Sequence, residues 1–199
     1  MYKVFIENKA VIFKINPNFK NKYLTKKEIW EKIDWLMTSR VDGMIFEIKN
    51  DKQFWYIFKK HIYIEAAGGL VERDGEFLFI KRNGVWDIPK GKIEKNEKIK
   101  TAAIREIEEE CGLIKPKIKN HLINTWHTYE MNGRIYLKRT YWFWLKEGKK
   151  KTKLIPQREE GITKVKYLPL SKFKKIRKNT YQSIIDVMDT LTNVRISKQ

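Results

Sequence analysis

The sequence predicts an α/β fold, in which a sandwich with a mixed sheet is preceded by a small N-terminal α/β subdomain. The chain has 199 residues, of which 42% are apolar and 13% aromatic, so it can bury a substantial core. Strand and helix patterns both occur before residue 60, and a second series of strands with accompanying helices follows residue 62. We therefore expect the subdomain at residues 1–60 and the sandwich at residues 61–199.

The N-terminal part has patterns for strands at residues 2–14 and 44–48 and for a helix at residues 25–37. Thr25 and Glu28 have the spacing of a capping box, which marks the start of the helix. Apolar side chains then follow at near-helical spacing: Ile29, Trp30, Ile33, Trp35 and Leu36. An aromatic amphipathic stretch comes next, at residues 54–58. This part contains no catalytic motif, and its role stays open.

The second part begins with a β-hairpin, residues 62–71 and 76–81, around the turn signal Asp74-Gly75. A loop with glycine and proline is expected at residues 83–91. A helix at residues 97–110 would follow, with Asn96 as its cap and Gly112 as its stop signal. Further strands are expected at residues 117–129, 135–145 and 163–168, and a closing helix at residues 180–191.

The formal net charge of +19 favours anionic partners. Phosphate-rich small molecules and RNA both meet that expectation, although lysine runs such as Lys149–Lys151 are equally consistent with a solvated surface loop. No apolar run approaches the roughly 20 residues that span a bilayer, and the N-terminus lacks the layout of a secretory signal. Cys111 is the single cysteine, which agrees with a reducing compartment. We expect a cytoplasmic protein without a membrane segment, in which Cys111 is a small apolar residue at a helix end.

The helix at residues 97–110 carries acidic residues on its inward-facing side. Glu106, Glu109 and Glu110 stand at spacings i, i+3 and i+4, and Ala102 and Ala103 lie on the same stripe as Glu106 and Glu110. A solvated acidic face is the usual alternative. However, carboxylates in the last turn oppose the helix dipole and repel one another, so stability alone does not favour them. A divalent cation would relieve both penalties, and oxygen ligands without histidine or cysteine point to Mg²⁺ or Mn²⁺.

The segment from Gly91 to Leu113 carries a resemblance to a known family. It reads Gly-Lys-Ile-Glu-Lys-Asn-Glu, seven further residues, and Arg-Glu-Ile-Glu-Glu-Glu-Cys-Gly-Leu. This resembles the Nudix box, G-x5-E-x7-R-E-U-x-E-E-x-G-U with U apolar, and every specified position matches. Fixed residues at rigid spacing are a strong signal. The wider resemblance covers roughly residues 63–191, including Ala66–Val71 and Trp86–Gly91, and it implies a Nudix-type α/β/α sandwich.

The resemblance also implies roles for residues of the box. Metals would be held by Glu106, Glu109 and Glu110, with the backbone carbonyl of Gly91, while Glu97 supports the site or binds a further metal. Arg105 would orient a neighbouring glutamate. The general base in such enzymes is either a box glutamate or a glutamate on a later loop. Here the later loop offers Glu160 as the candidate, with Glu159 close behind.

Substrate contacts must come from outside the box glutamates, which recognise only the diphosphate. Basic side chains beside the loop glycine or near predicted strand ends could hold phosphates: Arg82, Lys90, Lys92, Lys138 and Arg139. Tyr141, with His127 and Tyr129, could stack on or orient a base, although each such residue is more often a packing residue. The Pro-Lys-Gly-Lys entry to the box is similar to diadenosine polyphosphate hydrolases.

The resemblance implies hydrolysis of a phosphoanhydride bond in a nucleoside diphosphate linked to another moiety, with dinucleoside polyphosphates as the first expectation. RNA 5′-pyrophosphohydrolysis is favoured by the positive charge, and inositol pyrophosphate or ADP-ribose hydrolysis are further options. A non-catalytic ligand sensor or nucleic-acid-binding regulator is the alternative from another class, and the intact glutamates argue against it. A homodimer is expected by analogy with the fold alone.

Overall fold

The computed structural model describes residues 1–148 and 152–197, and the lysine run at 149–151 falls outside the described residues. The chain forms two compact units. Unit 1 comprises Met1–Ile64 and Thr125–Arg139, and unit 2 comprises Glu65–Asn124 and Thr140–Gln199. Unit 1 therefore includes one end of a later hairpin in addition to the N-terminal segment, whereas the predicted subdomain ended at residue 60. No helix in the described ranges is long and apolar enough to cross a membrane.

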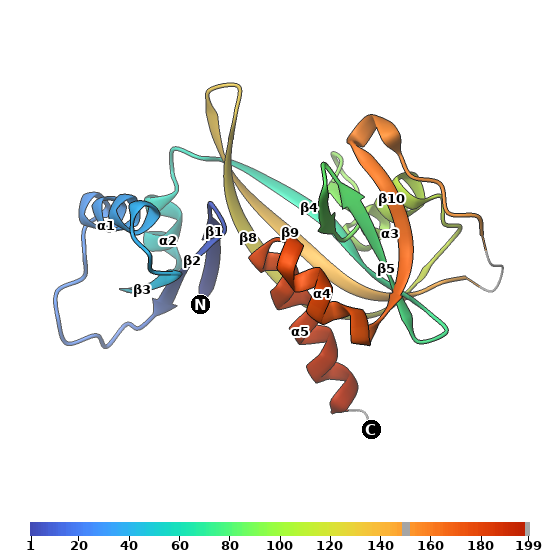
Figure 1. Cartoon of the computed structure of the whole chain (residues 1–199). Helices are drawn as coiled ribbons and strands as arrows, with labels where there is room; N and C mark the ends of the chain where they lie inside the picture. The colour runs from blue at the N-terminus through green and yellow to red at the C-terminus, as the bar shows by residue number, and fades with distance from the viewer. Residues whose placement is uncertain (149–151, 198–199) are drawn as a thin grey trace. The chain divides into compact units, whose positions relative to one another are not determined.

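Unit 1 is a small sheet covered by two helices (Figure 1). Strands β1 (Tyr2–Ile6) and β2 (Lys9–Ile15) form an antiparallel hairpin, and β2 pairs in parallel with β3 (Gly43–Ile48). β1 also pairs in parallel with the end of β8, where Val4 lies opposite Trp126. Helices α1 (Lys26–Thr38) and α2 (Asp51–Ile57) complete the unit. The strands and helix expected at the N-terminus are confirmed, and the aromatic stretch near residue 54 is part of α2.

Helix α1 begins where its capping signal predicted. The Thr25 side chain accepts from the Glu28 backbone N–H, and the Glu28 carboxylate accepts from the Thr25 backbone N–H, which satisfies two donors of the first turn. Three of the helix's apolar residues are buried, namely Ile29, Ile33 and Leu36. Trp35, expected on the apolar side by its spacing, is 56% exposed instead.

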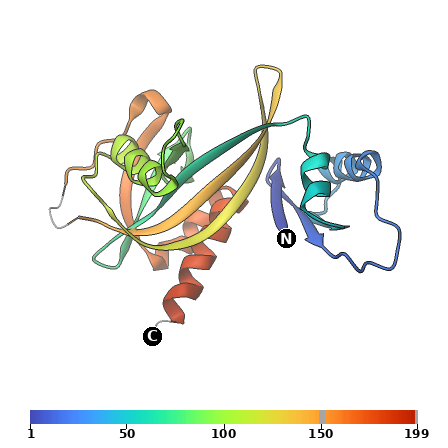
Figure 2. The ribbon, with the colours of Figure 1, turned by 180° about the vertical axis from the view of Figure 1, so that it is seen from behind.

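Unit 2 is a three-layer sandwich (Figures 1 and 2). Its strand order is β10-β5-β4-β9-β8. The strands are β4 (Ile62–Arg73), β5 (Glu76–Arg82), β8 (Lys117–Met131), β9 (Arg134–Lys146) and β10 (Ile162–Pro169). Helix α3 (Ile99–Cys111) covers one face, and the short α4 (Phe173–Ile176) and α5 (Gln182–Ile196) cover the other. Three single-turn 3₁₀ helices lie near these elements: Arg158–Glu160, Leu170–Lys172 and Arg177–Asn179.

Alternation along the strands supplies both faces of this sandwich. On β5, Leu78 and Ile80 pack in the core under α3, while Phe77 and Phe79 pack in the core under α4 and α5. β9 divides its side chains in the same way, with Trp142 and Trp144 on the second face. Because successive side chains of a strand point to opposite faces, an uninterrupted apolar run is what a sheet covered on both sides requires. The α/β/α sandwich with a mixed sheet is confirmed.

Two local expectations were wrong. The segment expected as an irregular loop at 83–91 contains two short strands, β6 (Val85–Asp87) and β7 (Lys90–Lys92), which pair with β5 and β4. Helix α3 begins at Ile99, two residues after the predicted start, because Asn96 has a left-handed φ of 65° and forms a turn, not a cap. Asparagine adopts this backbone region more readily than most residues.

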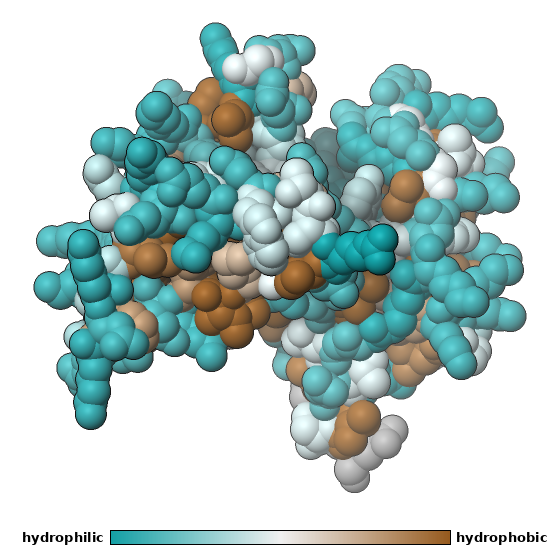
Figure 3. Space-filling view, turned by 60° about the vertical axis from the view of Figure 1, so that its left-hand side comes forward, coloured by the Kyte–Doolittle hydropathy of each residue, from teal (hydrophilic) through white to brown (hydrophobic). Residues whose placement is uncertain are grey.

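The surface view in Figure 3 shows hydrophilic side chains over most of one face, as expected for a chain with 43 lysines and arginines.

Candidate active site

Helix α3 brings the acidic residues of the motif to the sheet. Its buried side comprises Ala102, Ala103, Ile107, Glu110 and Cys111, and Gly112 ends it with a left-handed φ of 72°. Glu110 is only 2% exposed, so the acidic residues do extend the inward side of the helix as predicted. Glu108 lies elsewhere and accepts a 2.6 Å hydrogen bond from the Lys115 backbone N–H. Cys111 is a buried member of the core, as expected.

Arg105 holds three carboxylates of the motif together. Its guanidinium donates to Glu97 through Nε and Nη2 at 2.9 Å each, to Glu106 at 2.8 Å and to Glu109 at 2.9 Å. It also donates to the Lys92 carbonyl at 3.0 Å, which ties it to β7. These hydrogen bonds lower the pKa of Glu97 and raise that of Arg105. A planar guanidinium with five donors is suited to this arrangement, whereas an ammonium is not.

Glu97 lies in the turn before α3 and not in the helix. Its carboxylate accepts from the Glu94 backbone N–H at 3.0 Å and from Arg105. The turn at Asn96 therefore carries Glu97 back toward the helix face. The sequence pattern had predicted this residue at the start of the helix, which begins two residues later, at Ile99.

The Glu106 carboxylate packs directly against the backbone of Gly91. A Cβ at position 91 would lie 1.9 Å from Glu106 Oε2, so any residue larger than glycine would displace this carboxylate from its position against β7. Glu106 is mostly buried, and burial raises its pKa. The loop glycine and the first acidic residue of the helix thus form one tightly packed contact, although they are 15 residues apart in the sequence.

Glu110 belongs to a second group of contacts. It accepts from the Lys90 backbone N–H at 3.0 Å, and Arg82 Nη1 lies 3.4 Å from its other oxygen. Burial raises its pKa to about 7, against the opposing effects of Lys90 and Arg82. Within the described residues, no three His, Cys, Asp or Glu side chains converge on one point that could hold a metal ion. The predicted convergence of Glu106, Glu109 and Glu110 is therefore absent from this arrangement, which divides them between Arg105 and Arg82.

Asp87 lies at the candidate site, although no sequence pattern had pointed to it. Asp87 is 3% exposed, accepts from the Ile88 backbone N–H at 2.8 Å, and forms a 2.6 Å ion pair with Lys90. The sequence did contain a signal for its burial and ion pair, because Asp87 lies between the apolar residues Trp86 and Ile88 and three residues before Lys90. Because Lys90 is engaged by Asp87, its side chain is held beside the loop glycine.

The segment after residue 152 reaches the end of α3. The Ile155 N–H donates to the Cys111 carbonyl at 2.9 Å, and the Gln157 N–H donates to the Glu110 carbonyl at 3.2 Å. Arg82 then forms a short ion pair with Glu160, so that it links Glu160 to Glu110. Glu159 and Glu109 line one groove of about 510 Å³ beside this segment. Both candidate bases on the later loop are thus brought close to the acidic helix.

The predicted substrate residues are dispersed. Lys92 has an exposed side chain next to Gly91, and Tyr141 donates to Glu65 at 2.6 Å. Lys138 and Arg139 belong to unit 1, as do His127 and Tyr129. The Arg139 guanidinium lies 5.2 Å from the Trp126 ring centre, and Tyr129 stacks on Tyr136. The roles of these residues in substrate binding stay predictions.

The residues present fit a divalent cation. Glu106, Glu109 and Glu97 are hard oxygen donors around one guanidinium, and the missing Cβ of Gly91 lets the Glu106 carboxylate lie against the backbone of β7. Burial raises the pKa of Glu106, and the neighbouring charges of Glu109 and Glu97 add to this effect against the opposing contribution of Arg105. Rearrangement of these side chains from Arg105 toward a cation would supply the ligands.

The chain is similar to a known domain family and to several known proteins. The family model of the NUDIX domain matches residues 63–187. ADP-ribose pyrophosphatase of Methanocaldococcus jannaschii is 42% identical over 62 residues, 29% of this chain and 36% of that protein. CTP pyrophosphohydrolase of Escherichia coli is 33% identical over 78 residues, 36% of this chain and 56% of that protein. This chain therefore matches less than two thirds of the length of either relative.

The fold has a counterpart among solved structures. The ORF135 protein of E. coli superposes with a TM-score of 0.51 at 20% identity, over 70% of this chain and 95% of that one. This likeness concerns the fold alone. The family model, by contrast, matches more than half of the chain and includes every residue of the Gly91–Leu113 motif. The chain belongs to the Nudix family.

Proposed function

We propose that the protein is a pyrophosphohydrolase that uses Mg²⁺ or Mn²⁺ to cleave a phosphoanhydride bond in a nucleoside diphosphate linked to another moiety. The observation that carries the proposal is the contact set of Arg105, which gathers Glu97, Glu106 and Glu109 beside Gly91. When bound, the cation would neutralise the diphosphate and activate the attacking water. Cytoplasmic location and a homodimer stay predictions from the sequence.

The chain's own residues would then position the reaction. Glu106, Glu109 and Glu110 would hold the cation with the Gly91 carbonyl, and Glu97 would keep Arg105 in place. Glu160, held by Arg82 near Glu110, is the candidate that accepts the proton of the attacking water, and Glu159 is the second candidate. Lys90 and Lys92 lie on both sides of Gly91, where they can contact substrate phosphates.

Dinucleoside polyphosphates are the first substrate we propose, because the Pro-Lys-Gly-Lys entry is similar to that of diadenosine polyphosphate hydrolases and has a lysine on each side of Gly91 in the sequence. ADP-ribose and CTP, named in the descriptions of the two relatives, belong in the same panel. A second candidate is the 5′ end of triphosphorylated RNA, which the net charge of +19 favours. Both reactions break the same kind of bond, so they differ in what binds beyond the diphosphate.

The test is a substrate panel with matched variants. The wild type, Glu109→Gln and Glu108→Gln are incubated with Mg²⁺ or Mn²⁺ and diadenosine tetraphosphate, ADP-ribose, CTP, inositol pyrophosphate or 5′-triphosphorylated RNA, and the products are separated by chromatography. Glu108 lies outside the carboxylate cluster, and glutamine keeps its acceptor for Lys115. We expect cation-dependent cleavage that Glu109→Gln lowers by about 10²-fold or more and Glu108→Gln preserves. Tight binding of one compound without turnover would instead support the sensor alternative.

A further inference from the structure

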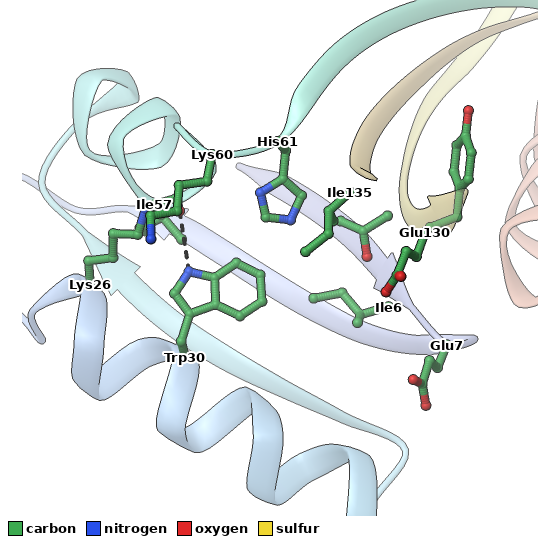
Figure 4. A pocket seen from close by; sticks show the side chains of 11 residues that line it. Ile6, Glu7, Lys26, Trp30, Ile57, Lys60, His61, Glu130 and Ile135 are labelled. Atoms are coloured by element: carbon green, nitrogen blue, oxygen red, sulfur yellow. Dashed lines mark hydrogen bonds between the residues drawn. The ribbon is translucent and has the colours of Figure 1, made fainter. Parts of the chain in front are cut away.

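Unit 1 contains a cavity that the hydrolase site does not use. Its volume is about 450 Å³, within the range of roughly 300–1,000 Å³ that is usual for small-molecule pockets. All of its lining residues belong to unit 1, and none belongs to the Nudix box. Figure 4 shows Ile6, Trp30, Ile57, His61 and Ile135 around it. The cavity therefore offers an apolar wall with two rings.

The rings of this wall are held in place. Trp30 Nε1 donates to the Ile57 carbonyl at 3.2 Å, and the Trp30 and His61 rings are nearly parallel, with centres 5.4 Å apart and an angle of 18°. Tyr129, from another part of the lining, stacks on Tyr136 with ring centres 5.2 Å apart. Fixed aromatic faces favour a planar ligand, because stacking then costs little conformational entropy.

Charge is separated across the cavity. Figure 4 shows Lys26 and Lys60 beside Ile57, and Glu7 and Glu130 on the other side, near Ile6. The Lys26 ammonium donates a hydrogen bond to the Tyr56 backbone carbonyl at 3.3 Å. Within residues 1–148 and 152–197, no ion pair engages any of these four charged side chains. One end of the cavity therefore suits an anion and the other a hydrogen-bond donor.

The lysine end is crowded with positive charge. Burial and the neighbouring Lys59 and Lys60 lower the pKa of Lys26. Lys59 and Lys26 both lie over the Tyr56 ring, at 4.5 Å and 5.6 Å from its centre. A bound anion would relieve this repulsion, since an opposite charge favours the protonated ammonium.

We propose that this cavity binds a nucleotide: a nucleobase against Trp30 and His61, with its phosphate at Lys26 and Lys60. Glu130 and Glu7 would accept hydrogen bonds from an exocyclic amino group, as carboxylates do from the amino group of cytosine. The site therefore prefers adenine, cytosine or guanine over uracil, which has no exocyclic amino group. The ligand is either a free nucleotide or a nucleotide within an RNA strand, because both present the same base and phosphate.

The experiment measures binding without hydrolysis. The full chain carrying Glu106→Gln and Glu109→Gln is titrated calorimetrically in EDTA with AMP, UMP and a short single-stranded oligoadenylate. Lys60→Glu and Lys32→Glu are added separately, since both lysines are exposed and both changes alter the net charge equally. We expect AMP to bind about tenfold more weakly to the Lys60→Glu variant, with less than a twofold change for Lys32→Glu. UMP is expected to bind about tenfold more weakly than AMP.

The two sources and a negative result are separated by the same titrations. Tighter binding of the oligoadenylate than of AMP, weakened by Lys60→Glu, assigns the site to an RNA strand. Equal or weaker binding of the oligoadenylate assigns it to a free nucleotide. Equal effects of Lys60→Glu and Lys32→Glu, equal affinities for AMP and UMP, or no binding of either probe would overturn the proposal. Melting curves of each variant establish that it is folded, and hydrolase activity does not enter any of these outcomes.

Discussion

At the scale of single residues, Gly91 is the position where one added atom has the clearest consequence. Gly91→Ala would place a Cβ 1.9 Å from a Glu106 oxygen, so Glu106 or β7 must move. We expect turnover to fall by about 10²-fold, as small displacements of catalytic groups commonly produce. The strain should also cost about 1–3 kcal/mol of unfolding free energy. Steady-state kinetics and denaturant melts measure the two effects. The control is Lys95→Ala, in the exposed turn that follows β7. Unchanged turnover of Gly91→Ala would show that Glu106 has no fixed role.

His61 gives a prediction about pH. Burial and the nearby Lys26 lower the pKa of His61, and the other charged groups at its cavity are Lys60, Glu7 and Glu130. A histidine with a lowered pKa in the folded state binds protons more weakly there than in the unfolded chain. It therefore adds stability above its unfolded pKa of about 6.5, and this contribution is lost as pH falls through the folded value. His61→Phe keeps a ring against Trp30 and cannot titrate. Its melting temperature should fall less between pH 7.5 and 5.5 than that of the wild type, and parallel curves would contradict the assignment.

At the scale of elements, Arg82 links the end of β5 to α3 and to the turn at Glu160. The sequence predicted that it binds substrate phosphate, whereas the structure engages its guanidinium with two carboxylates of the protein. We expect Arg82→Ala to lower kcat by about tenfold or more, because Glu110 loses a partner and Glu160 loses its position, while KM changes by less than about threefold. The control is Lys164→Ala, an exposed residue on β10. A large rise in KM at constant kcat would instead indicate that Arg82 binds the substrate.

The elements also show what could be predicted from the sequence. The turn signal Asp74-Gly75 before β5 and the capping box of α1 act locally, so these patterns identified those elements. The start of α3 and the position of Glu97 depended instead on the left-handed backbone of Asn96, which the residue type permits but does not require. Likewise, the motif identified the acidic residues of the site. Which of them contact Arg105 and which contact Arg82 depends on residues of β5 and β7. That information lies in tertiary contacts that no local pattern contains.

At the scale of the whole molecule, the chain forms two compact units, and each carries a separate proposed site for an anionic ligand. Unit 2 carries the hydrolase site, and unit 1 carries the cavity with Lys26 and Lys60. The net charge of +19 acts on ligands of both. Salt can separate this general attraction from specific contacts, since screening weakens interactions between distant exposed charges first.

Salt dependence is therefore the prediction that belongs to the whole molecule. If lysines and arginines of the protein neutralise about four phosphates of a single-stranded RNA, its binding constant should fall with a log–log slope of about −3, roughly 50-fold between 50 and 200 mM NaCl. The KM for a dinucleoside polyphosphate should rise less than about fivefold over the same range, because most of its contacts would lie within the carboxylate and lysine cluster around Gly91. Filter binding and initial rates provide the two measurements. An equally steep rise of KM would mean that lysines beyond the box form part of the substrate site, and would move the preferred substrate from the small molecule to the 5′ end of RNA.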